Sequence, residues 1–225
     1  MNVALLFLEI FCTFGCVVLF NKLFGRYGLL VWVPIASILA NIMTAKTVDM
    51  FGLSSTMGTV LFSSTFLATD ILTENYDVKY ARKAVYMGMA SVFFYIVSSQ
   101  IAIQYIPSAF DYAHESMVTI FSLSLRISIS SIIMYFVANM ADVYLYDKLK
   151  SRMQGKCMWL RNNVSTILCN CLENFLFMFM AFIGVYDIGT VVVMALSTSV
   201  IEIIAGVCDT PFLYLATKWV YKKED

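Results

Sequence analysis

Hydrophobic residues gather in seven long segments along the chain, separated by short connections that hold most of the charged residues. The segments span residues 3–20, 29–45, 56–72, 84–106, 118–146, 164–183 and 188–217. Each comes near the ~20 apolar residues that a membrane-spanning helix requires. The apolar runs are continuous and do not alternate with polar residues, which excludes a transmembrane β-barrel. The pattern therefore predicts seven transmembrane helices, of which the fifth and seventh are long enough to tilt or to extend beyond the bilayer.

The composition agrees with this prediction. Of 225 residues, 60% are hydrophobic and 13% are charged, and the mean hydropathy is +0.80. A soluble domain carries roughly 25% charged residues, so this chain lacks the polar surface to cover a globule in water. We predict an all-α integral membrane protein with a single domain, residues 1–225, in contact with lipid. The net charge of zero gives no indication of a nucleic-acid partner.

The basic residues of the connections predict the orientation. Thirteen of them follow the first, third and fifth segments or lie in the tail: Lys22, Arg26, Lys79, Arg82, Lys83, Lys148, Lys150, Arg152, Lys156, Arg161, Lys218, Lys222 and Lys223. The other connections hold Lys46 alone. Because basic connections stay in the cytoplasm, we expect the N-terminus outside and the C-terminus inside a bacterial inner membrane.

Ionisable residues interrupt the apolar segments. They are Glu9, Asp70, Arg126, Asp142, Glu173, Glu202 and Asp209. Each charged group at the centre of a transmembrane helix costs ~2.5–3.5 kcal/mol on insertion scales. These side chains must therefore face inward, pair with one another or line a wet cavity. Some could be purely structural pairs, but an intramembrane charge indicates a functional site by default.

Helical spacing places these groups on polar faces. The face of the sixth segment consists of Thr166, Asn170, Glu173, Asn174 and Phe177. The face of the fifth consists of Ser128, Ser131, Tyr135, Asn139 and Asp142, while Arg126 and Ser130 lie on another. In the seventh, Glu202 and Asp209 are seven residues apart and share a face, and Glu74 follows Asp70 by one turn. Polar faces on several helices of a small bundle predict a cavity for a polar ligand.

The depth of these groups suggests a path. Arg126 lies about eight residues, or ~12 Å, inside the outer end of its segment. Glu173 and Glu202 fall near the middle of the membrane, and the three aspartates fall nearer the cytoplasmic side. A donor toward one side, with acceptors running to the other, suits a solute path or a proton relay.

Motifs for other chemistry are incomplete. His114 and Glu115 begin like a zinc-protease motif, but His114 is the only histidine of the chain. The sequence has no phosphate-binding glycine-rich loop, so we do not expect it to hydrolyse ATP itself. It also lacks a nucleophile–base pair. We therefore expect no catalytic residue, no metal and no cofactor.

Three ordered blocks resemble the queuosine precursor transporter family, earlier labelled a putative vitamin uptake transporter family. The first is residues 66–82, with Thr69, Asp70, Glu74, Asn75, Tyr76, Ala81 and Arg82. The second is residues 126–146, with Arg126, Ser130 and Asp142, and the third is residues 159–177, with Arg161, Asn163, Ser165, Thr166, Asn170 and Glu173. The end of the last segment, residues 209–214, is also similar. The resemblance covers residues 29–217 and implies a core of six transmembrane helices, with residues 3–20 as an additional helix in front.

The chain departs from the family pattern at a few positions. Asp77 stands where the family usually has glycine, and this affects a turn. Glu202 stands where many members have lysine, which bears on the substrate. The acid at Glu173 is often aspartate.

The resemblance implies import of 7-deazaguanine bases for tRNA modification: the 7-cyano and 7-aminomethyl queuosine precursors, or queuine. A carboxylate can accept two hydrogen bonds from the guanine-like edge, and Arg126 or Asn170 could donate to the ring carbonyl. Phe177 or Tyr135 could form a wall for the ring. A cationic aminomethyl arm needs an acid of its own.

The substrate-binding residues that we expect are Asp70, Glu74, Arg126, Ser130, Tyr135, Asn139, Asp142, Asn170, Glu173, Asn174, Phe177, Glu202 and Asp209. Two alternatives stay open: the substrate-binding membrane subunit of an ATP-driven vitamin-type uptake system, and an intramembrane enzyme. The sequence leaves open the energy source (proton coupling, trapping of the base or an external ATPase) and whether the chain forms a homo-oligomer.

The orientation can be tested by labelling. A membrane-impermeant thiol reagent should react in intact cells with a single cysteine placed at Ser108, which is predicted to lie outside. It should not react with one placed at Met153 in the basic connection. The reverse pattern would overturn the orientation.

Overall fold

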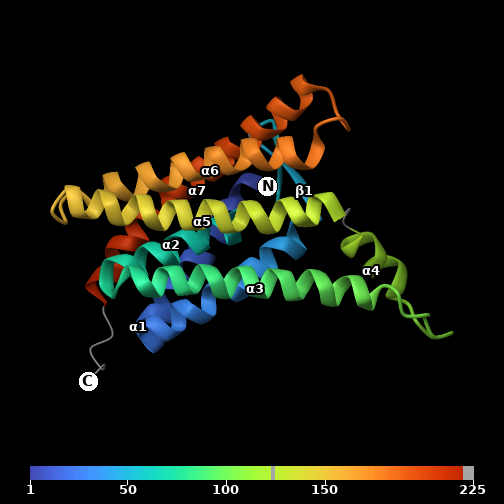
Figure 1. The fold of residues 1–225 in the computed structure, drawn as a ribbon, viewed down its shortest axis with the longest axis horizontal. Coiled ribbons are helices and arrows are strands. Elements are labelled where there is room, and N and C mark those ends of the chain that lie inside the picture. Colours follow the sequence, from blue (N-terminus) through green and yellow to red (C-terminus); the bar gives the residue numbers. More distant parts are fainter. Residues whose placement is uncertain (123–124, 220–225) are drawn as a thin grey trace.

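The computed structural model describes residues 1–122 and 125–219. Figure 1 shows an elongated bundle of helices with a small hairpin. Its elements are α1 Asn2–Met43, β1 Thr47–Met50, β2 Leu53–Thr56, α2 Thr59–Asn75, α3 Val78–Ala102, α4 His114–Phe121, α5 Leu125–Arg152, α6 Met158–Phe182 and α7 Ile188–Lys218. Among the described residues, five helices are long and apolar enough to cross a membrane: α1, α3, α5, α6 and α7. The all-α prediction is confirmed.

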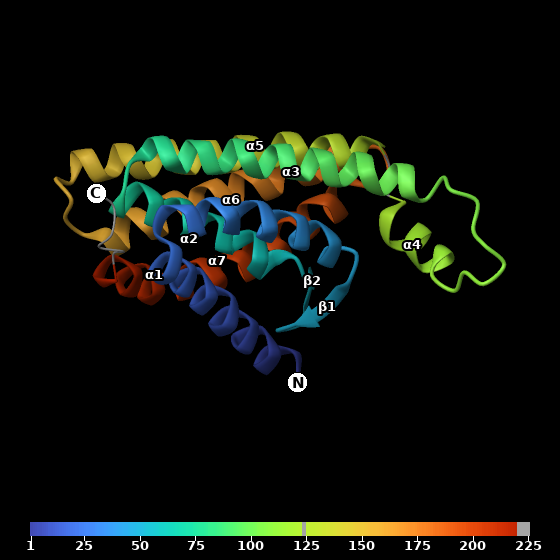
Figure 2. The same cartoon turned by 90° about the horizontal axis from the view of Figure 1, so that it is seen from below.

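The first two predicted segments form one element, α1. The connection that the sequence predicts at residues 21–28 is helical except at Gly25, whose φ of 59° and ψ of −143° break the helix. A positive φ suits glycine, which has no Cβ. Figure 2 shows the two halves of α1 diverging from this break, so that the chain reverses direction. Next to the break, Asn21 donates to Ala216 O (3.2 Å) and accepts from Tyr76 Oη (2.9 Å), which holds the reversal against α7 and α2.

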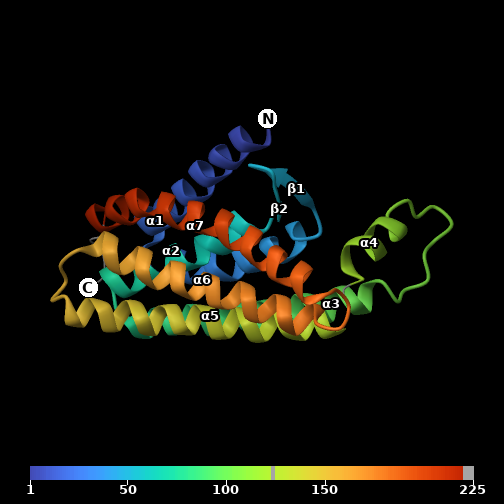
Figure 3. The ribbon, with the colours of Figure 1, turned by 90° about the horizontal axis from the view of Figure 1, so that it is seen from above.

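Helix α2 lies at the centre of the bundle. Thirteen of its 17 residues are buried. It contacts α1, α3, α5 and α7, and Figures 2 and 3 show it between α1 and α7 on one side and α3 and α5 on the other. Several of its hydroxyl groups bond within the helix: Ser64 Oγ donates to Leu61 O (2.6 Å) and Thr73 Oγ1 to Thr69 O (2.9 Å). Small, internally satisfied side chains allow four helices to approach it closely.

The hairpin between α1 and α2 was not predicted from the sequence. Strands β1 and β2 pair antiparallel, with Met50 opposite Leu53. The two turn residues, Phe51 and Gly52, have φ values of 54° and 77°, as a two-residue type I′ turn requires. Its strands have four residues each, too few for the hydrophobic pattern to reveal them. Asn2 Nδ2 donates to Asp49 O (3.0 Å), which joins the hairpin to the start of α1.

The fifth predicted segment is divided in the structure. Its first residues belong to the short helix α4, residues 123–124 lie outside the described residues, and α5 begins at Leu125. Helix α4 has no buried residue, and its end is joined to α3 because Gln100 Nε2 donates to Phe121 O (2.6 Å). At its other end, α5 continues past residue 146, where the segment was predicted to end, to Arg152.

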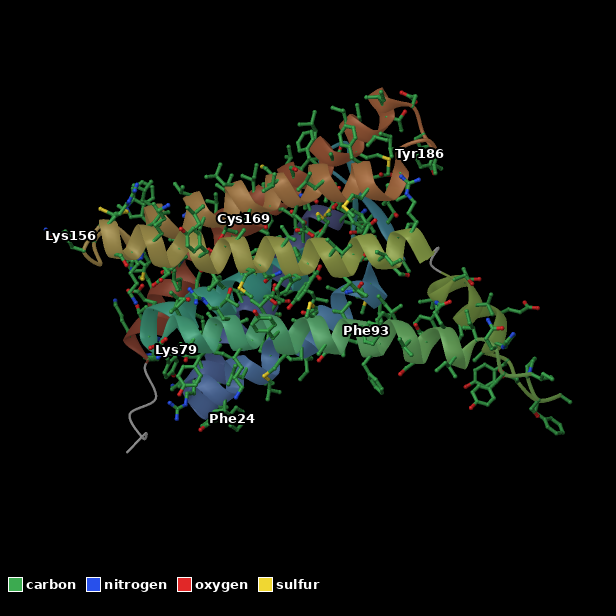
Figure 4. The ribbon with its side chains drawn as sticks, in the orientation of Figure 1. Phe24, Lys79, Phe93, Lys156, Cys169 and Tyr186 are labelled. Atoms are coloured by element: carbon green, nitrogen blue, oxygen red, sulfur yellow. The ribbon has the colours of Figure 1, made fainter. Side chains whose placement is uncertain are left out.

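The basic connections gather at one end of the bundle, called the basic end below. Figure 4 shows Phe24, Lys79 and Lys156 at this end, and Tyr186 at the opposite end. Contacts tie the basic end together: Lys22 Nζ lies 4.3 Å from the Trp219 ring centroid. Lys222 and Lys223, counted in the orientation prediction, lie outside the described residues.

Candidate functional site

A cavity of about 130 Å³ lies between α1, α2, α5, α6 and α7, in the half of the bundle away from the basic end. Its principal polar and aromatic lining residues are Phe62, Tyr135, Glu173, Asn174, Phe177 and Glu202. An apolar cavity of ~150 Å³ accepts one benzene molecule, so this space is on the scale of a single aromatic ring.

Two acids face this cavity from neighbouring helices. Asn174 Nδ2 donates to Glu202 Oε2 (2.5 Å), and Glu202 is 4% exposed. Glu173 lies close enough to Glu202 for the two carboxylates to interact electrostatically. Its Oε2 atom is buried without a hydrogen-bond partner among the described residues. This unpaired acceptor atom is therefore available to a ligand N–H group.

Aromatic rings form another wall of the cavity. Phe62 packs edge-on against Tyr135, with ring centroids 6.0 Å apart, and against Phe66, at 5.3 Å. Ser37 Oγ lies 3.1 Å from Tyr135 Oη, which fixes the phenol at the base of the wall. The cavity therefore combines ring surfaces with carboxylate and amide groups, as expected for a planar, hydrogen-bonding ligand.

Three aspartates lie deeper in the bundle, outside the cavity lining. Asp70 of α2, Asp142 of α5 and Asp209 of α7 are all fully buried; together they are called the aspartate cluster below. The carboxylates of Asp70 and Asp142 lie next to each other, and Asp209 interacts with Asp70. Two unit charges of like sign 4 Å apart repel by about 4 kcal/mol at an effective dielectric constant of 20.

The aspartate cluster has few hydrogen-bond donors. Asn162 Nδ2 donates to Asp209 Oδ1 (2.6 Å). The four carboxylate oxygens of Asp70 and Asp142 receive no hydrogen bond from a described donor group. Ser165 Oγ interacts with Asp142 and also donates to Asn162 O (3.2 Å). The described ion pairs of the basic end are made with Glu74, so the pair of carboxylates has a neutral hydroxyl and no described cation as its partner.

An ion-paired group closes the basic end. Arg161 Nη2 lies 2.5 Å from Glu74 Oε2, and Tyr146 Oη donates to the same oxygen (3.2 Å). Lys150 Nζ donates to Thr73 O (2.6 Å) and lies 3.6 Å from Glu74 Oε2. Arg161 is fully buried, with its guanidinium 5.4 Å from the Tyr146 ring centroid. A hollow of about 410 Å³, lined by residues that include Glu74 and Arg161, lies beside this group.

Arg161 was not predicted as a site residue. The sequence analysis counted it among the basic residues of a connection, but α6 begins at Met158 and includes it. A signal was present in the spacing. Asn162, Thr166, Asn170 and Asn174 recur every four residues, and Arg161 precedes Ser165 by four, so the polar face of α6 extends back to both positions.

The structure brings most of the expected residues together in two groups. The cavity contains Tyr135, Glu173, Asn174, Phe177 and Glu202. The cluster contains Asp70, Asp142 and Asp209, with Glu74 one turn nearer the basic end. Asn139 accepts from Thr65 Oγ1 (3.1 Å), and Asn170 is buried with neither amide atom bonded to a described group.

Two expected residues lie apart from these groups. Arg126 is exposed, and its Nε donates to Met180 O (2.6 Å) near the end of α6. Ser130 is buried in α5 but is not among the cavity-lining residues.

Outside the membrane-spanning segments, Asp187 begins α7. Its carboxylate accepts from the Thr190 hydroxyl (2.6 Å) and backbone N–H (3.0 Å). These hydrogen bonds lower the pKa of Asp187. The residue therefore acts as a helix cap, which accounts for it without a role in the site.

Comparison with known proteins gives consistent matches. Residues 56–216 match the family described as "Putative vitamin uptake transporter". The chain is 32% identical to the "Probable queuosine precursor transporter" of Bacillus subtilis (strain 168), over 94% of this chain and 93% of the relative. It is 26% identical to the "Queuosine precursor transporter" of Escherichia coli (strain K12), over 70% of each chain. No solved structure gives a significant match.

The buried ion pair generates a prediction about stability. Arg161→Met leaves Glu74 without its main counter-charge, and breaking a buried pair in this way costs ~3–5 kcal/mol. We expect a loss at or below the low end of this range, because Lys150 stays nearby and Glu74 is 17% exposed. The free energy of unfolding can be measured by denaturant titration of the purified protein in detergent.

A second variant, Glu74→Gln, tests whether the lost stability comes from the uncompensated charge on Glu74. Combined with Arg161→Met, it should restore much of the lost stability by removing the uncompensated charge. Arg126→Met, at an exposed arginine, is the matched control and should change the unfolding free energy little. A double variant that loses as much as the sum of the single variants would show that the pair is not coupled.

Proposed function

We propose, because this chain belongs to the putative vitamin uptake transporter family, that it imports queuosine precursors across the bacterial inner membrane. The observation that carries this proposal is the 32% identity to a probable queuosine precursor transporter over nearly the full length of both chains. Membership of this family makes the chain a multi-pass membrane transporter and not an enzyme. The substrates would be 7-deazaguanine bases, which are then used in tRNA modification.

The proposed topology has seven crossings in a single transmembrane domain. The two halves of α1 cross separately, and α2, α3, α5, α6 and α7 cross once each. The core of six helices then begins at the second half of α1, and the first half is the additional helix. The N-terminus lies outside and the C-terminus in the cytoplasm, which the collection of basic residues at one end of the bundle supports.

The cavity residues suit a 7-deazaguanine ring. One of the two carboxylates, Glu173 or Glu202, would accept the N–H and exocyclic amine of the guanine-like edge. Phe62, Tyr135 and Phe177 would contact the ring faces and edges. A two-ring base exceeds a 130 Å³ cavity of single-ring scale, so part of the base would extend through the open side of the cavity or a wall residue would move on binding.

The ring carbonyl of the base needs a donor. The sequence suggested Arg126 or Asn170. Asn170 is the better placed of the two, because its buried amide bonds to no described group while the Arg126 guanidinium is bound to Met180 O at an exposed site. Asn170 lies one turn before Asn174 on the polar face of α6, so its amide would meet the base from the basic side of the cavity.

Uptake by a strain that requires an external precursor tests the proposed function. Cells that cannot synthesise the base should grow at low queuine and accumulate labelled queuine only when they express this chain. A strain expressing the Glu9→Gln variant is a matched control, because Glu9 lies on α1 away from the cavity lining, and should behave like wild type. No uptake by a stably inserted wild-type protein would refute the proposal.

The surplus acid of the cavity predicts the preferred substrate. One carboxylate suffices for the guanine edge, so the other suits a cationic arm. The lysine that the family resemblance implies at position 202 in other members would repel such an arm. We expect 7-aminomethyl-7-deazaguanine and queuine to be favoured over the 7-cyano base. Glu202→Gln should reduce this preference by ~1–3 kcal/mol, the size of a hydrogen bond to a charged group.

The measurement is competition of each base against labelled queuine uptake, in wild type and in the Glu202→Gln variant. The glutamine side chain of this variant keeps an acceptor for Asn174, so a change in ranking reports the lost charge and not a lost contact. If the cyano base competes best in wild type, or if the ranking is the same in both proteins, Glu202 has no role in substrate choice.

A further inference from the structure

We propose that the aspartate cluster binds the proton that drives import, and that one proton enters with each base. This inference rests on the proposed function, because it assigns an energy source to that transport. It concerns Asp70, Asp142 and Asp209, none of which lines the cavity proposed for the base. Two separate sites, one for substrate and one for the coupling ion, allow the binding of each to change the affinity for the other.

The first observation is a fully buried pair of acids with no described cation as its partner and the neutral hydroxyl of Ser165 beside Asp142. Asp70 and Asp142 come from different helices, are inaccessible to solvent and lie next to each other. None of their four oxygens accepts a hydrogen bond from a described donor. Two adjacent carboxylates in such a place are compatible with burial when they share a proton. The pair is therefore built to take up one proton and to release it when the surroundings change.

The basic side chains nearest the basic end are bound to groups other than Asp70 and Asp142. Arg161 and Lys150 both contact Glu74, at 2.5 and 3.6 Å. Arg26 of α1 donates from Nη1 to Tyr80 Oη (2.8 Å). A cation in direct contact with the aspartate pair would hold both carboxylates ionised, whereas these three side chains are engaged elsewhere.

The charged and titratable neighbours of the pair come from four helices. They are Glu74 of α2, Tyr146 of α5, Cys169 of α6 and Asp209 of α7. Apart from the two acids, these groups are a phenol and a thiol, which are neutral near pH 7 in their ordinary state. The neighbours therefore supply acceptor sites for a mobile proton and no permanent positive charge at the pair.

The second observation is a series of interacting acids, with one thiol, that runs from the cavity to the hollow at the basic end. Glu173 lines the cavity, and Cys169 interacts with Glu173 on one side and with Asp142 and Asp70 on the other. Asp70 in turn interacts with Glu74, which lines the hollow at the basic end. Figure 4 shows Cys169 midway between the ends of the bundle, marked by Lys156 and Tyr186. The cluster, which interacts with Cys169, thus lies between the cavity and the hollow at the basic end.

The ligand is a proton and not a metal cation. Within the described parts of the chain, no three His, Cys, Asp or Glu side chains are grouped so that they could hold a metal ion. Carboxylates that meet pairwise can share a proton without enclosing a cation. In the proposed step, a hydronium ion that enters from the cavity side loses a proton, and an O–H bond forms on a carboxylate of the Asp70–Asp142 pair. This O–H bond breaks when the proton passes to water at the basic end.

Purified protein in liposomes tests this proposal. Counterflow of labelled queuine and of labelled 7-cyano-7-deazaguanine measures transport without an energy source. Accumulation is then driven by an acid-outside pH gradient of one unit, with the membrane potential clamped. The cyano base is used here because its exocyclic amine is not basic and it has no aliphatic amine that would itself follow the gradient. One proton per neutral base should give about tenfold accumulation, and adding the base outside should make the external medium more alkaline.

Variants separate coupling from transport. Asp142→Asn and Asp70→Asn should each keep counterflow, lose gradient-driven accumulation and abolish the proton flux that the base induces. Glu9→Gln, an intramembrane acid of α1 outside the cluster, should keep all three. If an aspartate variant does not fold, the proton flux of the wild-type protein still decides whether import is proton-coupled.

The outcomes distinguish the two proposals. Counterflow with neither base would refute the proposed transport function, and the coupling proposal with it. Counterflow without accumulation or proton flux in wild type would overturn proton coupling alone. Full gradient-driven accumulation by both aspartate variants would place the coupling site elsewhere.

Discussion

A carboxylate inside a bundle surrounded by lipid is stable only when another group compensates its charge, and this constraint shapes the interior of the protein. The carboxylates of this protein are accommodated in three different ways between the two ends of the bundle. At the basic end, Glu74 is paired with Arg161 and Lys150. Near the cavity, Glu202 accepts a hydrogen bond from Asn174. Between them, Asp70 and Asp142 lie against each other with the Ser165 hydroxyl nearby and no described cation, which is why the middle of the bundle is the place proposed for a mobile proton.

The central position of α2 makes this arrangement geometrically feasible. Its many Ser, Thr and Ala side chains occupy little volume, so α1, α3, α5 and α7 can all contact it. The hydroxyl groups of Ser64 and Thr73 bond to carbonyls of their own helix and do not compete for the acids. As a result, Asp70 of α2 meets Asp142 of α5 and Asp209 of α7 without an intervening layer of large side chains.

The separation of the cavity from the aspartate cluster suggests how the two proposed sites communicate. Both use the same helices: α5 contributes Tyr135 and Asp142, and α7 contributes Glu202 and Asp209. A rotation or tilt of either helix would therefore change both sites at once. Coupling in such a bundle does not need a long pathway, because rigid helices carry the displacement from one site to the other.

The amino-acid pattern was enough to predict the long apolar helices, the acids and amides that they carry inward, and the collection of basic residues at one end, because hydrophobic length and helical period are local properties. It also identified five of the cavity-lining residues. It did not predict that the first two segments form one element or that α4 is separate from α5. Which arginine is buried depended instead on how the helices pack. Arg126 was expected inside and Arg161 in a connection, yet Arg126 is exposed and Arg161 is fully buried against Glu74. Spacing along a chain gives a residue's face and depth on its own helix, whereas its partner depends on which helices pack against that face.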